Sequence, residues 1–321
     1  MIGFWRLGGL SGKELAGRVW REIQVDDVFG YAAELSFYFL LALFPLLLLL
    51  TDLFGYFAQG PELRASLLDY FQRVLPGSAY RLVVDTLNQI TLGAGGGKLS
   101  IGILATLWAA SNGMSAVCDG LNAAYEIKDG RPWWKVKLLA IGLTLAFAMF
   151  TVVALILVLL GDKIGWLLGS WLGYQHSFTL AWNLIRWPFV VLAVLFAINL
   201  LYRFAPDLKQ WEWQWMTPGA LIAVTLWILM SLGFQFYLRF FNTYNATYGS
   251  LGAVIILMLW FYITGAAILI GAEVNSEIEN AAARAGDLNA RLPGEKRPRQ
   301  NRILGGLPWF RKRSQPGAAS Q

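Results

Sequence analysis

Side chains that carry metal, nucleophilic or redox chemistry are scarce in this sequence. It contains one cysteine, Cys118, and one histidine, His176. This count excludes a disulfide framework and a CxxC zinc motif, and one histidine is too few for a histidine metal site. A phosphate-binding loop of the type GxxxxGK[ST] is also missing. The residue types give no sign of an enzyme, so we expect no catalytic residue, no metal site and no cofactor.

A polar residue inside a long apolar stretch is a stronger candidate for function. Arg186 is the clearest case, because a charge within a membrane-spanning helix costs about 2.5–3.5 kcal/mol on insertion scales. Its guanidinium could bind an anionic headgroup or pair with a carboxylate in a cavity. Its long side chain could equally reach the outer membrane interface. Both interpretations stay open at the level of sequence.

Glu273 and Asn275 lie at the end of the last apolar stretch. A carboxylate near a helix C-terminus is disfavoured by the helix dipole, so we expect a positive partner for Glu273. Arg203 lies at the same expected depth, and Glu34 could compete for it. Such a pair would be a gate or an ion-coupling site, or a salt bridge that only fixes helix packing.

Two further positions are candidates within the apolar stretches. Ala105, Ala109 and Gly113 repeat at four-residue spacing, which is typical of close helix contacts in membranes. Asn112 lies beside them, and we expect it to donate or accept a hydrogen bond to a neighbouring helix. Pro45 removes a backbone hydrogen bond in mid-helix and predicts a kink, which could line a cavity or serve packing alone.

The elements that carry these residues follow from composition. Hydrophobic residues make up 57% of the 321 positions and charged residues only 14%, against about a quarter charged in soluble domains. A hydrocarbon core of about 30 Å needs roughly 20 apolar residues per helix. Runs of that length cover about 32–54, 99–118, 138–160, 180–202, 216–238 and 249–272. They are too long and continuous for barrel strands, so we predict an all-α membrane bundle of about six transmembrane helices.

The basic residues set the expected orientation. Most of the 26 Lys and Arg residues lie in segment 1–30, in the connections 119–137 and 203–215, and after position 272. Only six basic residues are assigned to the opposite side: Arg64, Arg73, Arg81, Lys98, Lys163 and Arg239. Cytoplasmic loops are rich in Lys and Arg. We therefore expect a multi-pass protein of the cell inner membrane with both termini in the cytoplasm.

Outside the spans we expect a cytoplasmic segment 1–30, a transmembrane domain 31–280 and a basic, disordered tail 281–321. Segments 61–75 and 79–90 show helical amphipathic spacing and predict interfacial helices on the outer face; segment 10–23 is a weaker candidate on the inner face. The tail could bind anionic lipid headgroups at about 1 kcal/mol per basic residue, or only set orientation. Nucleic acid is not an expected partner, because no folded binding module accompanies the charge.

Several short motifs, in order along residues 15–280, resemble the YihY/BrkB family of bacterial inner-membrane proteins. The first are residues 32–45 (AAELSFYFLLALFP), 107–113 (LWAASNG) and 121–125 (LNAAY). The C-terminal half adds residues 202–206 (YRFAP), 218–220 (PGA), 248–252 (YGSLG), 260–262 (WFY) and 271–275 (GAEVN), with Trp227 and Tyr244. The last motif has Val274 where the family pattern leads us to expect leucine, which is a conservative difference.

The resemblance implies a six-helix inner-membrane protein without known catalytic residues. It also implies links to virulence, to serum resistance and to lipid or lipopolysaccharide export, and the family has carried a ribonuclease label. The sequence speaks against that label, because a metal-dependent nuclease needs a cluster of histidine and carboxylate ligands. We expect transport or export of a lipid or another amphipathic envelope substrate. A membrane scaffold for an envelope complex, with membrane lipids as its neighbours, is the alternative.

Overall fold

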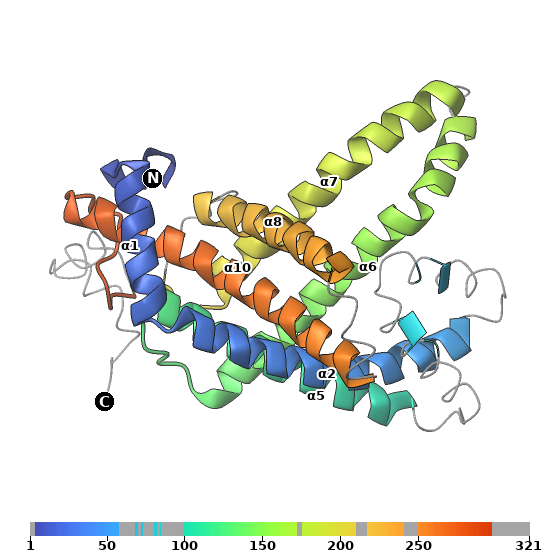
Figure 1. The fold of residues 1–321 in the computed structure, drawn as a ribbon, viewed down its shortest axis with the longest axis horizontal. Coiled ribbons are helices and arrows are strands. Elements are labelled where there is room, and N and C mark those ends of the chain that lie inside the picture. Colours follow the sequence, from blue (N-terminus) through green and yellow to red (C-terminus); the bar gives the residue numbers. More distant parts are fainter. Residues whose placement is uncertain are drawn as a thin grey trace, which may run out of the picture.

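The computed structural model describes residues 4–57, 68–69, 72, 80–81, 84, 99–171, 175–209, 217–240 and 250–296. Over these residues all regular secondary structure is helical, which confirms the predicted fold class (Figure 1). Each predicted apolar run coincides with one long helix. The helices are η1 (Phe4–Gly9), α1 (Gly12–Val25), α2 (Val28–Phe57), α5 (Leu99–Ala124), α6 (Trp133–Trp171), α7 (Gln175–Phe204), α8 (Pro218–Phe240) and α10 (Ser250–Arg284).

The helix bounds extend beyond several predicted runs. α5 continues past Cys118 to Ala124, and α10 continues past Ala272 to Arg284. Hydrocarbon thickness limits the length of an apolar run, but backbone hydrogen bonds keep a helix favourable beyond the hydrocarbon. The apolar run therefore identified each helix and underestimated its length.

The amphipathic N-terminal segment forms α1 and starts with a capping box. The Ser11 hydroxyl accepts from Glu14 N at 3.3 Å, and the Glu14 carboxylate accepts from Ser11 N at 2.9 Å. This pair satisfies two of the free amides at the helix start. Leu15, Val19 and Ile23 follow at four-residue spacing and are buried. They place one face of α1 in the protein core, where α1 packs on α10.

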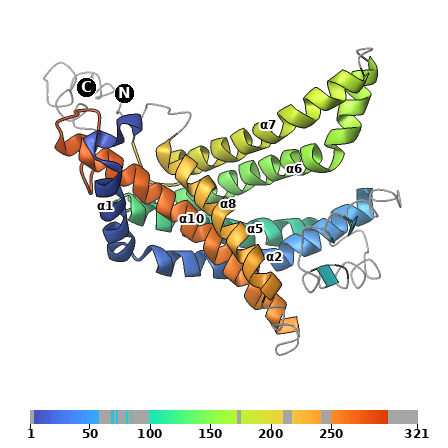
Figure 2. The same ribbon diagram turned by 45° about the horizontal axis from the view of Figure 1, so that its top comes forward.

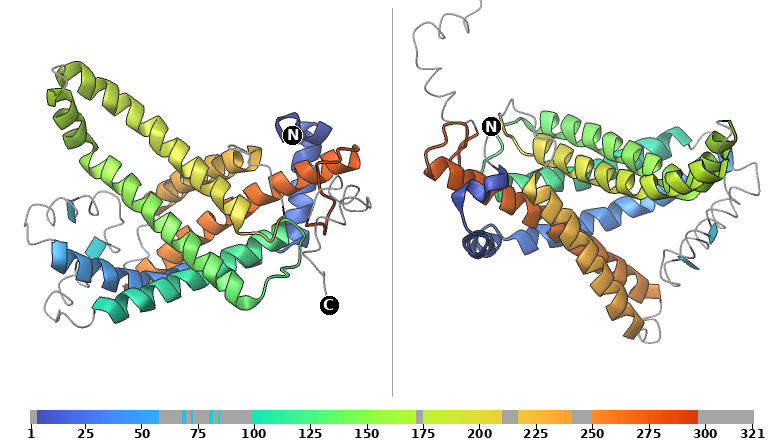
Figure 3. Two further views of the ribbon diagram at one scale, coloured as in Figure 1. Left: turned by 180° about the vertical axis from the view of Figure 1, so that it is seen from behind. Right: turned by 90° about the horizontal axis from the view of Figure 1, so that it is seen from above.

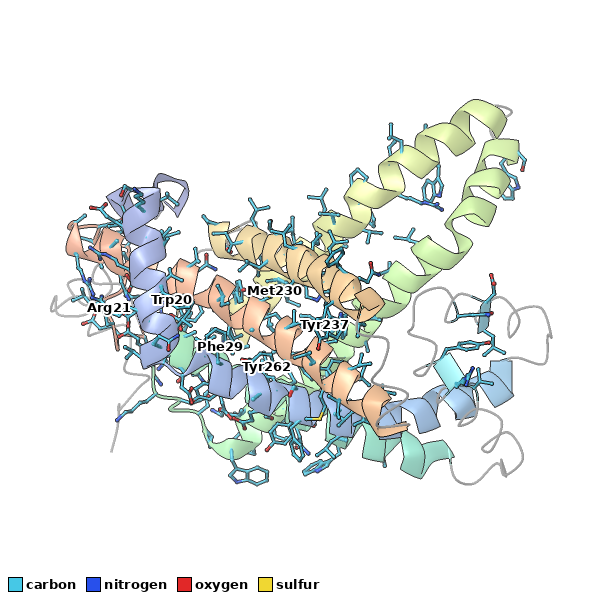
Figure 4. All side chains as sticks on the ribbon, viewed as in Figure 1. Trp20, Arg21, Phe29, Met230, Tyr237 and Tyr262 are labelled. Carbon is cyan, nitrogen blue, oxygen red and sulfur yellow. The ribbon has the colours of Figure 1, made fainter. Side chains whose placement is uncertain are left out.

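The helices pack as neighbouring pairs around α10. α2 packs on α5, α6 packs on α7, and α10 packs on both α8 and α2. Figure 2 shows α6 and α7 running side by side as a hairpin that projects away from α8 and α10. Phe29 of α2 stacks with Tyr262 of α10, with ring centroids 6.5 Å apart (Figure 4). α10 is therefore the helix that joins the N-terminal and C-terminal parts of the bundle.

Glycine allows α8 and α10 to approach closely. A methyl group added at Gly219 would lie 2.5 Å from Asn275 Cγ, and one added at Gly271 would lie 2.5 Å from Gly219 O and 2.7 Å from Ala223 Cβ. Neither position has room for a side chain, because real Cβ contacts are longer than 3 Å. Small residues at such a crossing let two backbones meet, which is a main source of stability between membrane helices.

The apolar surfaces of the helices fit a membrane. Among the described residues, four helical stretches are long and apolar enough to cross a bilayer: Trp133–Thr151, Leu184–Phe204, Pro218–Leu238 and Gly252–Arg284. A shorter apolar stretch covers Val28–Leu43 of α2, whose later side chains lie outside the description. The stretches expose large apolar side chains such as Leu138, Met149, Leu192 and Leu229. Lipid contact accounts for this exposure, because water would disfavour it.

The first part of the predicted disordered tail is instead folded. Ala281, Ala282 and Ala283 are buried within α10, and Ala290 and Arg291 are buried in the segment that follows it. The prediction was wrong for residues 281–296 because it was based on composition, whereas buried contacts hold this segment. Residues 297–321 lie outside the described part. So do nearly all residues of the predicted outer helices 61–75 and 79–90.

The close crossing gives a test of the packing. We expect Gly271→Ala to lower the free energy of unfolding by about 1–3 kcal/mol, because an added methyl group overpacks the contact. Gly233→Ala on α8 is the matched control, since no heavy atom lies within 4 Å of its added methyl group. Thermal unfolding of the purified proteins in detergent measures both. Equal melting temperatures for the two variants would contradict the close crossing.

Candidate functional site

The buried polar end of α10 is the main concentration of polar side chains in the described core. We use this name for residues 273–280, of which Glu273, Asn275, Ser276, Glu277, Glu279 and Asn280 are polar and buried. A polar group removed from water costs free energy unless it gains a partner. The partners come from α1, from the connection after α5, from the start of α8 and from the segment after α10, while η1 packs on the same helix (Figure 3).

Asn275 fixes the start of α8. Its Oδ1 accepts from Gly219 N at 2.9 Å, and its Nδ2 donates to Thr217 Oγ1 at 3.0 Å. Thr217 Oγ1 in turn donates to Asn199 Oδ1 of α7 at 2.9 Å. The chain of hydrogen bonds therefore ties α10 to α8 and α7. It satisfies amides at the start of α8 that no helical carbonyl can reach.

Glu279 forms a buried ion pair with a residue beyond α10. Arg291 Nε donates to Glu279 Oε1 at 2.9 Å, and Arg291 Nη2 donates to Glu279 Oε2. Both side chains are almost fully buried, and the guanidinium lies 5.5 Å from the centre of the Tyr125 ring. This bidentate ion pair holds the segment after α10 against the bundle.

A second polar network joins the connections at the same end. Arg131 binds Asp129 through Nη2 and Nε, and its Nη2 also donates to Ala205 O at 2.9 Å. Asn122 Nδ2 donates to Asp129 Oδ2 at 3.0 Å, while Asn122 Oδ1 accepts from Asp207 N at 2.8 Å. Lys296 pairs with the Asp207 carboxylate. The connection 125–132 is thereby fastened to the connection after α7.

Glu273 has surroundings that differ from the prediction. Its side chain is 1% exposed, and the charged groups with the largest influence on it are the carboxyls of Asp26, Glu22, Glu126 and Glu277. The expected positive partner, Arg203, is not among them. The prediction placed the two residues at one depth but could not foresee that α1 and the connection after α5 cover Glu273.

The other predicted residues are dispersed. Asn112 accepts a hydrogen bond from Lys137 Nζ of α6, a neighbouring helix. Glu34 is exposed on α2. α2 continues through Pro45, whose side chain lies outside the description, so the predicted kink stays a prediction. Arg186 lies in α7 about 25 Å along the helix from Arg203, given a rise of about 1.5 Å per residue.

Several residues of the site were missed from sequence. A carboxylate repeat at four-residue spacing, Glu273 and Glu277, was a visible signal that one helix face is polar after Ala272. Asp26 and Arg291 carried no such signal, because Asp26 meets the polar end of α10 from a distant part of the chain and Arg291 lies beyond the end of the helix. Among the described residues, no group of three or more His, Cys, Asp and Glu side chains is placed to hold a metal ion.

Comparison with known proteins gives consistent matches. The family model described as virulence factor BrkB matches residues 19–294. The putative ribonuclease-like protein YfkH of Bacillus subtilis is 39% identical over 245 residues, which cover 76% of this chain and 88% of that protein. A UPF0761 membrane protein of Xanthomonas campestris is 30% identical over 270 residues, 81% of this chain. One from Xanthomonas oryzae is 30% identical over 285 residues, 86% of this chain.

The Xanthomonas relatives are longer than this chain. This chain spans 59% of the length of the Xanthomonas campestris protein and 62% of that of the Xanthomonas oryzae protein. No solved structure matches the chain.

The buried ion pair gives a second test. We expect Arg291→Ala to lower the free energy of unfolding by about 3–5 kcal/mol, because it leaves the Glu279 carboxylate buried and uncompensated. Arg21→Ala is the matched control. Arg21 is mostly exposed and pairs with Glu22 at 3.1 Å, and such surface pairs contribute about 0–1 kcal/mol. Unfolding in detergent followed by circular dichroism measures both, and a loss at Arg291 no larger than that at Arg21 would contradict the buried pair.

Proposed function

Because the chain belongs to the family of virulence factor BrkB and is an integral membrane protein, we propose that it transports an amphipathic substrate. The substrate class is a lipid or a related envelope component, and the membrane is the inner membrane of a bacterium. Both termini face the cytoplasm in this proposal, and the membrane lipids are its immediate partners.

The start of α6 is the observation that carries the proposal. Lys137 Nζ lies 4.3 Å from the centre of the Trp108 ring and donates to Asn112 Oδ1. Trp108 is 58% exposed, so this cation stands at the surface of the bundle. A cation held beside an exposed tryptophan at the end of a membrane span has the chemistry that binds an anionic headgroup.

An apolar surface continues from this position along α6. Leu138, Leu145, Met149 and Val153 are exposed on the same helix. A lipid has the same division, with a charged head at one end and an apolar body along the rest. The arrangement therefore supports an amphipathic substrate better than a small polar one.

The ends of the helices support the orientation. Hydrogen bonds and ion pairs join the segment after α5, the connection after α7 and the segment after α10 at one end of the bundle. α1 lies at the same end through Arg18 and Glu277, whose charged atoms are 3.9 Å apart. The segments at this end are rich in Lys and Arg, as is usual on the cytoplasmic side. The basic residues at 297–321 are proposed to add attraction to anionic lipids.

Nucleotide bound at a P-loop is not the energy source in this proposal, because the sequence lacks that motif. An ion gradient, a partner protein or the gradient of the substrate fits the proposal. Ribonuclease activity, named for the relative YfkH, is not part of it. The sequence has one histidine, and no described group of three or more His, Cys, Asp and Glu side chains could hold a metal ion, which is poor material for a metal-dependent nuclease.

A membrane scaffold is the second candidate, because the side chains of Asn112 and Asn275 already have partners within the protein. Both side chains are used in contacts between helices. Such contacts fix packing whether or not anything is transported.

Lipid exchange in vesicles tests the proposal. We expect the purified protein to accelerate movement of a labelled anionic phospholipid between the leaflets of reconstituted vesicles. Lys137→Gln should lower the rate roughly fivefold, since a charge contact with a headgroup is worth about 1 kcal/mol. Arg186→Ala should also lower the rate if its guanidinium meets the substrate.

Lys128→Gln is the matched control for Lys137. Lys128 is an exposed lysine in the connection between α5 and α6, outside the contact with Trp108 and Asn112. It should leave the rate unchanged at equal protein incorporation. A wild-type rate equal to that of protein-free vesicles would overturn transport and leave the scaffold.

A further inference from the structure

Asp26 and Glu273 form an unusual contact between α1 and α10. Asp26 is the C-cap residue of α1, and Glu273 lies in the buried polar end of α10. Asp26 Oδ2 and Glu273 Oε1 are buried atoms without a donor among the described groups. The two carboxyl groups are nonetheless within hydrogen-bonding reach of each other. Ionised carboxylates only accept, so this contact becomes a hydrogen bond when one of the two carries a proton.

The charges around the contact favour a proton. Three carboxyls from three elements act on both groups, namely Glu22 of α1, Glu126 after α5 and Glu277 of α10. The basic groups nearby lie against other carboxylates. Arg18 Nη1 is 3.9 Å from Glu277 Oε2 without a hydrogen bond, Arg21 pairs with Glu22 at 3.1 Å, and Arg284 acts on Glu126. Asn280 donates to Glu126 at 3.1 Å and to Glu277 at 3.3 Å, and Arg291 binds Glu279.

A metal ion is a poorer occupant of this place than a proton. The described carboxyls here are not grouped so that three could hold a metal ion. A proton needs only the two oxygens that lack a donor. It also removes one negative charge from a cluster in which carboxyls outnumber guanidinium groups.

We propose that Asp26 and Glu273 bind one proton between them at neutral pH, and that this proton fastens the end of α1 to α10. We call this proton-dependent contact between the end of α1 and α10 the latch, and the proposal does not depend on transport. When the proton leaves, two carboxylates face each other in a buried contact. The end of α1 then separates from α10, while Leu15, Val19 and Ile23 keep the rest of α1 in place.

The titration of Asp26 supports this assignment. Burial, followed by the charges of Glu126 and Glu22, raises the pKa of Asp26 from 3.8 to about 6. A coupled pair titrates in two steps. The step of Asp26 falls in weak acid, and the carboxylates around Glu273 disfavour loss of the remaining proton. In the unfolded chain both groups lose their protons by about pH 5. The stabilisation by these protons is therefore full in acid and is lost as the pH rises through the pKa values of the folded state.

Infrared spectroscopy tests for the proton itself. We expect the wild-type protein in detergent to show the carbonyl stretch of a protonated carboxyl group at neutral pH, and Glu273→Gln to lack it. Asp26→Asn should shift this band, because the hydrogen-bond partner changes from a carboxylate to an amide. Glu34→Gln is the control, since Glu34 is exposed on α2, and it should leave the band unchanged.

Amide hydrogen exchange tests for the latch. After correction for intrinsic rates, peptides from α1 of the wild type should lose protection as the pH rises from neutral to about 10. Glu273→Gln should keep that protection at every pH, because its amide donates to Asp26 as the shared proton did. This variant preserves size and hydrogen bonding, so it is expected to fold.

Two results would overturn the proposal. One is a spectrum of Glu273→Gln that equals that of the wild type at neutral pH. The other is protection of α1 that depends on pH equally in both proteins. Neither readout uses lipid exchange, so absence of transport would leave the latch standing.

Discussion

Polar side chains occupy the end of α10 where surrounding elements exclude water, from Glu273 to Asn280. Each buried donor and acceptor there needs a partner, and α10 cannot supply enough of them. Asn275 takes its partners from the start of α8, and Glu279 takes Arg291 from the segment after α10. The need to satisfy these groups therefore decides where the surrounding elements lie. Removing any one element would leave buried charges or amides without partners.

The same end of the bundle explains why separate sequence motifs belong together. Gly219 and Gly271 come from two motifs and meet at the close crossing of α8 and α10. Asn122 and Ala205 come from two others and are joined through Asp129 and Arg131. Each motif alone is short and common. Together, the residues of these motifs make the contacts that form one polar end of an otherwise apolar bundle. The helices α6, α7 and α8 present apolar side chains to lipid.

The buried polar residues are of two kinds, which differ in whether neighbouring helices supply their hydrogen-bond partners. Asn275 and Asn112 have their bonds occupied by neighbouring helices, which is sufficient reason for their presence. Glu273 differs, because the charged groups that act on it most are other carboxyls. An arrangement that is unfavourable in its fully ionised form points to a protonated form. Such a group is suited to respond to pH in a way that a satisfied amide is not.

Hydropathy and charge in the sequence determined the membrane class, the number of long helices and the side on which basic connections gather. These follow from one-dimensional patterns, because the bilayer acts on each helix separately. Asn112 was also a candidate from sequence, because it lies beside a repeat of small residues that is typical of close helix contacts. The partner of Glu273 and the folding of residues 281–296 were decided by tertiary structure. Asp26 and Glu126 are distant in sequence from Glu273, and Arg291 lies beyond the end of α10, so only the tertiary packing brings these groups together. Burial depends on what covers a residue, and its immediate sequence does not contain that information.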